Sequence, residues 1–193
     1  MYGGSFRVED ASGPTAQPMT SLIFSEYIEG GGDNKVLEIY NGTGYPVQLD
    51  QYTIEVYNGG QSTPWGTPWA VGTYGAVLPS GQSYVFVNSG ADPAILAKKN
   101  KDVGSLDFNG DDAVVLRDPS GTIVDVIGQI GFDPGDFWGD ATVKTQGKIL
   151  RRKKTVTGGW APGTAAFDPT VQWNGYATIN GATMAAGLGT WQE

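Results

Sequence analysis

Cysteine and histidine are absent from this sequence of 193 residues. Without cysteine there is no disulfide, no thiolate nucleophile and no cysteine zinc site. Without histidine there is no Ser-His-Asp relay and no imidazole proton shuttle. The chain is nevertheless long enough to bury one hydrophobic core without crosslinks. The two absences therefore exclude whole classes of enzyme but not a stable fold.

Charge and long apolar runs are also scarce. Charged residues make up 17% of the chain, with 20 acidic and 12 basic side chains and a net charge of −8. An acidic surface repels phosphate backbones at long range, so nucleic acid is disfavoured as a partner. No apolar run approaches the roughly 18 residues that span a bilayer, and we expect no membrane insertion. The segment 1–5 lacks a basic region and an apolar region, so we expect no signal peptide in this chain.

What the sequence has is turn formers and β formers. It contains 30 glycines and 11 prolines, and the apolar stretches between them are rich in β-branched and aromatic residues. Asp92 followed by proline predicts a short helix at 92–97. Asn41-Gly42 is typical of a hairpin turn. The predicted strands are 22–28, 36–40, 52–57, 75–78, 83–88, 113–117 and 122–127.

The spacing of these strands predicts an all-β sandwich. Residues 1–20 show no periodicity and are interpreted as an N-terminal arm, and residues 21–176 as the sandwich domain. Residues 177–193 are interpreted as an irregular C-terminal extension, since 128–148 and 157–193 are rich in turn formers. One domain with two extensions is the predicted organisation.

Several blocks, in order, resemble the lamin tail domain in its bacterial form. They are IFSEYIEG (23–30), LEIYN (37–41), FNGDDAVVL (108–116), VDVIGQIG (124–131), LRRK (150–153) and FDP (167–169). The resemblance extends over about 22–176 and implies an immunoglobulin-like β-sandwich. Bacterial forms are often attached to extracellular nucleases and surface proteins, but no nuclease domain is expected in these residues. The resemblance implies a reusable docking unit.

An acidic segment at 107–112 has the spacing of a calcium loop. Oxygen-bearing side chains occupy its first, third and fifth positions, and hard oxygen ligands suit Ca²⁺. However, Asp112 replaces the glycine expected at the sixth position, and strands flank the segment. We therefore favour a tight Asn109-Gly110 turn with Asp111 and Asp112 as solvated shoulders, and no cofactor. The candidate calcium ligands are Asp107, Asn109, Asp111 and Asp118.

Glu26 and Glu38 lie on successive predicted strands and could face each other across a ladder. Two carboxylates that flank a cleft can divide acid and base roles, as in glycoside hydrolysis. The resembled module has no known hydrolytic activity, and we favour hydrogen-bonded structural glutamates.

Two basic clusters hold 8 of the 12 basic residues. A concentrated stripe can bind phosphates despite a negative total. No aromatic residue is interleaved with either cluster, so we favour a solvated face or a contact with an acidic patch on a neighbouring subunit. The clusters are Lys98, Lys99 and Lys101, and Lys148, Arg151, Arg152, Lys153 and Lys154, of which the last four form the candidate basic patch.

The segment 63–69 repeats Thr-Pro-Trp and carries Trp65 and Trp69. Two indoles beside prolines form a good platform for a sugar ring or a protein interface. The equally weighted alternative is that they cover a sheet edge.

Together these features predict a non-enzymatic structural or docking module. We expect it in a protein assembly or homo-oligomer, such as a virion decoration or a cell-surface or extracellular structure. An accessory DNA-holding domain of a secreted nuclease or phosphoesterase is the first alternative, and a carbohydrate-binding module is the second.

Overall fold

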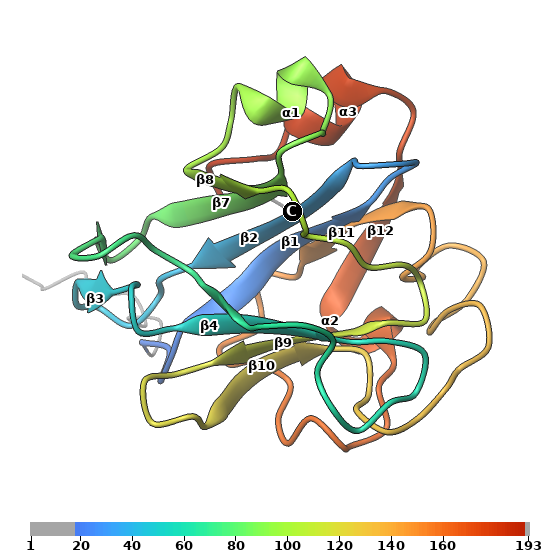
Figure 1. Ribbon diagram of the computed structural model, residues 1–193, viewed down its shortest axis with the longest axis horizontal. Helices are drawn as coiled ribbons and strands as arrows, with labels where there is room; N and C mark the ends of the chain where they lie inside the picture. Colours follow the sequence, from blue (N-terminus) through green and yellow to red (C-terminus); the bar gives the residue numbers. More distant parts are fainter. Residues whose placement is uncertain (1–17, 192–193) are drawn as a thin grey trace, which may run out of the picture.

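The computed structural model describes residues 18–191, and most of its ordered elements are strands (Figure 1). A six-stranded sheet has the order β12-β11-β1-β2-β7-β8, a four-stranded sheet the order β10-β9-β4-β5, and β3 pairs with β6. All strand pairs are antiparallel except β7 with β8. The strands are β1 (Ile23–Glu29), β2 (Lys35–Tyr40), β3 (Val47–Gln48), β4 (Thr53–Tyr57), β5 (Trp69–Ala70), β6 (Val77–Leu78), β7 (Ser83–Asn88), β8 (Lys101–Val103), β9 (Ala113–Arg117), β10 (Ile123–Ile127), β11 (Lys148–Arg152) and β12 (Trp173–Ala177).

The seven predicted strands and the predicted helix are confirmed, with boundaries that differ by two residues or less. The helix is α1 (Pro93–Leu96), and the Asp92 carboxylate accepts a hydrogen bond from the Ala94 N–H at 2.8 Å. Helices α2 (Pro169–Gln172) and α3 (Gly181–Ala185) were not predicted from the sequence, and neither were β3, β5, β8, β11 and β12. The missed strands are short, or carry charged and glycine residues that obscure a period of two.

The principal core lies between the two larger sheets. Alternation along the strands sends Tyr27, Leu37, Phe86 and Leu150 of the six-stranded sheet toward Ile54 and its neighbours in the four-stranded sheet. The chain is therefore an immunoglobulin-like all-β sandwich, as predicted.

The other face of the six-stranded sheet is also covered, which explains why all of β1 is buried. Helices α1 and α3 lie side by side over it (Figure 1). A second apolar cluster forms beneath them, where Ile28 and Val36 pack with Ile95, Met184 and Leu188. The C-terminal segment, residues 178–191, is thus a layer of the fold.

The predicted division of the chain needs correction at its C-terminal end. The boundary at residue 176 falls inside β12, and the extension contains α3. Residues 1–17 of the predicted arm lie outside the described residues. Met19 is buried, and its N–H donates to the Gly42 carbonyl at 3.0 Å.

The predicted hairpin at Asn41-Gly42 is wrong, because β2 pairs with β1 and β7 and not with the strand that follows it. The buried Asn41 amide instead donates to the carbonyls of Tyr45 and Leu78, each at 2.8 Å. None of the helices in residues 18–191 is long and apolar enough to cross a membrane.

Candidate binding pocket

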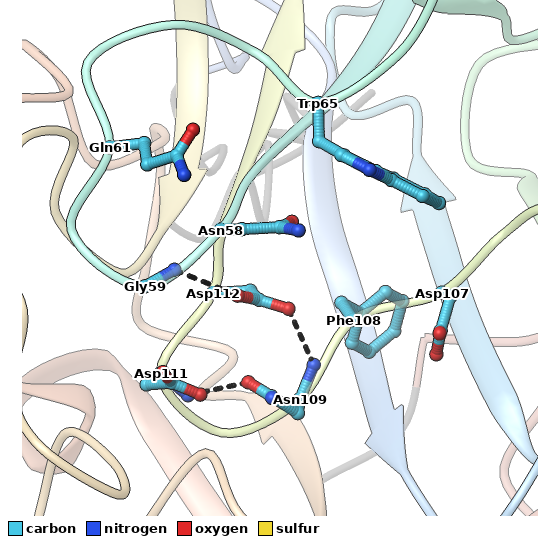
Figure 2. Close-up of a pocket in the computed structure, with 9 residues that line it drawn as sticks. All are labelled: Asn58, Gly59, Gln61, Trp65, Asp107, Phe108, Asn109, Asp111 and Asp112. Carbon is cyan, nitrogen blue, oxygen red and sulfur yellow. Dashed lines mark hydrogen bonds between the residues drawn. The ribbon is translucent and has the colours of Figure 1, made fainter.

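Two loops at one end of the sandwich enclose a pocket of about 340 Å³ (Figure 2). One loop joins β4 to β5 and the other joins β8 to β9. The lining is rich in acidic and carboxamide side chains and contains one tryptophan. The lining residues are Asn58, Gly59, Gln61, Trp65, Asp107, Phe108, Asn109, Asp111 and Asp112.

The 109–112 segment forms a tight turn, as favoured from the sequence. The two carboxylate oxygens of Asp112 accept hydrogen bonds from the N–H groups of Gly59 at 3.0 Å and Asn109 at 2.9 Å. The Asp111 N–H donates to the Asn109 side-chain oxygen at 3.2 Å (Figure 2). Asp112 is only 7% exposed, so it joins the two loops and is not a solvated shoulder.

Burial raises the pKa of Asp112, and the negative charges of Asp111 and Asp107 raise it further. The hydrogen bonds from Asn109 and Gly59 act in the opposite direction. The pocket therefore concentrates negative charge at its base.

The four candidate calcium ligands do not come together. Asp118 begins the turn after β9, whereas the other three precede that strand, so the length of β9 puts them about 20 Å apart. The Asp118 carboxylate accepts hydrogen bonds from the Ser120 hydroxyl and the Thr122 N–H. Within residues 18–191 no group of three or more acidic side chains is placed to hold a metal ion. The predicted four-ligand site is wrong because Asp118 belongs to a different turn.

The two tryptophans of the predicted platform also separate. Trp65 lies on the pocket wall with 45% of its surface exposed. Trp69 opens β5, pairs with Ile54 in the ladder, and donates its indole N–H to Ser105 at 3.1 Å. Trp65 therefore fits the binding interpretation, and Trp69 fits the edge-covering one.

The prediction of an exposed basic patch at Arg151, Arg152, Lys153 and Lys154 is wrong, because Arg152 is buried. Arg152 is fully buried between the sheets, where its guanidinium pairs with Asp125 and lies 4.0 Å from the Trp173 ring centroid. Alternation along β11 sends Arg151 to the opposite face, where it pairs with Glu26 at 3.3 Å and lies over Tyr176.

The lysines near these residues also have partners. Lys153 donates to the carbonyls of Thr170 and Val171, and Lys154 contacts Trp191. In the other cluster, Lys99 pairs with Asp102, and Lys101 donates to the Ala70 carbonyl. Arg151 and Arg152 lie on opposite faces of the six-stranded sheet, so the four residues of the candidate basic patch do not form one continuous exposed stripe.

Glu26 and Glu38 do face each other across the β1–β2 ladder. Glu38 accepts hydrogen bonds from the hydroxyls of Ser25 and Ser83 and from the Gly189 N–H. Burial raises the pKa of both carboxyls, and that of Glu26 reaches about 8. The C-terminal segment covers the pair, which favours the structural interpretation.

Three pocket residues were not predicted from the sequence: Asn58, Gln61 and Phe108. Asn58 and Gln61 come from a loop about fifty residues before the acidic turn, and one sequence offers no signal of that contact. The exposed Trp65, combined with polar residues in the same loop, was the usable clue.

The fold and pocket together define an immunoglobulin-like sandwich with a recessed site at one end. Comparison with family models matches residues 15–131 to the Lamin Tail Domain. The chain belongs to the lamin tail domain family. The matched range contains both pocket loops, while β11 and β12 lie beyond it. No curated protein matches the sequence.

Proposed function

We propose that this protein is a non-enzymatic docking module that holds a partner protein through the pocket beside Trp65. The observation that carries this proposal is the contrast between the pocket and the buried charges. In the pocket, the side chains of Asn58, Gln61 and Asp107 make no hydrogen bond within the described part of the chain. These groups are available to a ligand.

The strongly perturbed acids, in contrast, are committed to the fold. Proton transfer to a substrate needs a titratable group within hydrogen-bond reach of it. Burial raises the pKa of Glu26 to about 8, but its side chain is only 2% exposed. This arrangement supports recognition in preference to turnover. The larger assembly, whether a virion or a cell-surface or extracellular structure, remains a prediction from the sequence.

The test measures which polypeptides the immobilised protein captures from an extract of the cells that produce it. Full-length protein, a Trp65→Ala variant and a Tyr74→Ala variant are immobilised at equal density. Tyr74 is fully exposed outside the pocket, so its variant controls for loss of a surface aromatic side chain. We expect the wild type and Tyr74→Ala to retain the same polypeptides and Trp65→Ala to lose them.

Equal retention by Trp65→Ala would remove the pocket from the docking surface. Sedimentation velocity extends the test to self-association, because a homo-oligomer would sediment faster with increasing concentration. A chain that stays monomeric and retains no protein would contradict the docking proposal.

A further inference from the structure

The pocket has the chemistry of a cation site with an aromatic wall. Three of its nine lining residues are acidic, and none of the nine is lysine or arginine. Asp112 is already engaged by two backbone N–H groups, which leaves Asp107 and Asp111 as available carboxylates. The charges of Asp107 and Asp111 each raise the pKa of Asp112, so both carboxylates lie near enough to Asp112 to repel its negative charge. A positively charged ligand would relieve this repulsion.

The backbone that carries the aromatic wall is fixed independently of the acids. The backbone N–H of Trp65 donates to the Val56 carbonyl of β4 at 2.7 Å, which anchors this point of the loop to the sheet. Below it, Phe108 is 1% exposed and stacks on Tyr27 with ring centroids 5.0 Å apart. Figure 2 shows the Trp65 indole across the pocket from Asn109 and Asp111. A half-exposed indole beside carboxylates is a favourable surface for a cation.

The carboxamides narrow the ligand class. Asn58 and Gln61 offer oxygen acceptors that no other described group uses. A guanidinium has five N–H donors in a plane and can stack on an indole while it donates to carboxylate and amide oxygens. A trimethylated ammonium could stack but has no N–H group to donate these hydrogen bonds, and a mono- or dimethylated one has fewer donors than a guanidinium. The hydroxyls of a neutral sugar could donate to the amide and carboxylate oxygens, but a sugar carries no positive charge to offset that of the carboxylates.

We propose that the pocket binds an arginine side chain presented by a partner protein. The pocket volume suits one long side chain rather than a folded surface. This inference rests on the docking function proposed above, and it specifies the partner's chemistry. The indole of Trp65 stacks on the guanidinium, the negative charges of Asp107 and Asp111 attract it, and Asn58 and Gln61 accept N–H groups from it.

The test uses blocked Gly-Gly-Arg-Gly-Gly and the same peptide with citrulline in place of arginine. Citrulline has nearly the same shape without the charge. Binding to the full chain is followed by the NMR signals of the indole N–H groups. We expect millimolar binding of the arginine peptide, weakened about 5- to 30-fold by Trp65→Ala or by Asp107→Asn. Asp118→Asn, in the exposed turn after β9, is the matched control and should leave binding unchanged. Raising the salt concentration should weaken binding.

Several results would overturn the inference. Equal binding of the citrulline peptide would show that charge is not recognised. Tighter binding of tetramethylammonium would indicate a methylammonium cage, and Trp65-dependent binding of an oligosaccharide would indicate a sugar site. Competition by millimolar Ca²⁺ that requires Asp107 and Asp111 would indicate a metal site.

The two proposals fail separately. Partner capture that depends on Trp65, without arginine binding, would refute the arginine inference and keep the docking function. Arginine binding combined with partner capture that does not depend on Trp65 would support the arginine site and place the docking surface elsewhere.

Discussion

At the scale of single residues, the charged side chains divide into those that build the fold and those that line the pocket. Asp125 shows the first kind: its two carboxylate oxygens accept from the N–H groups of Phe24 and Trp160, and it pairs with Arg152. These contacts tie β10 of one sheet to β1 and β11 of the other. A buried charge is tolerated only when it is paired and hydrogen-bonded in this way.

Glu26 is the residue whose charge state should control stability. One of its oxygens pairs with Arg151, while the other is buried without a partner in the described structure. Burial is the main cause that raises its pKa from 4.5 to about 8, with a smaller contribution from Glu38. The protonated carboxyl is therefore the form that the fold prefers. The contribution of protonated Glu26 to the free energy of unfolding is complete below its unfolded-state pKa of 4.5. This contribution is lost as the pH rises through about 8.

The Glu26→Gln substitution keeps the side-chain shape and removes this titration. We expect the wild type to lose about 2–4 kcal/mol more free energy of unfolding than the variant between about pH 5 and 9. Urea unfolding at several pH values measures the difference. Asp118→Asn is the control, because hydrogen bonds from Ser120 lower the Asp118 pKa and place its titration in acid. Parallel pH profiles for wild type and Glu26→Gln would contradict this account.

At the scale of elements, the C-terminal helix α3 is part of the core. Met184 and Ala185 of α3 pack with Leu188, Ile28 and Ile149 on the outer face of the six-stranded sheet. Turn-forming residues suggested an irregular tail, since five helical residues are too few to show a helical period. The helix forms because its apolar side chains pack on the apolar outer face of the six-stranded sheet.

Met184→Asp should test that role. It places an unpaired charge in the second core, and we expect a loss of about 3 kcal/mol or more of stability. Ile179→Asp is the matched control, because Ile179 lies in the same segment with 74% of its surface exposed. Thermal unfolding and dye binding to exposed apolar surface report the effect. Similar melting temperatures for the two variants would show that α3 does not stabilise the sheet.

At the scale of the whole molecule, the matched family range and the folded unit have different limits. The match ends at residue 131, but β11 pairs with β1 near the middle of the six-stranded sheet. Residues after 131 also supply Arg152 to Asp125, and Trp138, Leu150 and Trp173 to the principal core. The cooperative unit therefore extends to the C-terminal segment.

A fragment of residues 18–131 should consequently fail to fold, whereas a fragment of residues 18–191 should fold. We expect the shorter one to show little dispersion of its amide NMR signals and no cooperative thermal transition, because β1 would lack its neighbour and Asp125 its partner. The longer fragment, measured in parallel, is the control. A cooperative transition in the shorter one would mean that residues 132–191 are accessory.

The sequence by itself determined the all-β class, seven strands, α1 and the family, because local alternation, turn residues and capping are encoded by neighbours along the chain. It also indicated the acidic turn and Trp65, although not that they line one pocket. Tertiary structure alone decided that Arg152 is buried and that Trp65 and Trp69 separate. Only the tertiary structure shows that the C-terminal segment covers Glu26. The burial of Arg152 depends on pairing between strands more than a hundred residues apart, β1 with β11, and the place of Trp69 depends on its pairing with β4. No local pattern specifies which strand is the neighbour.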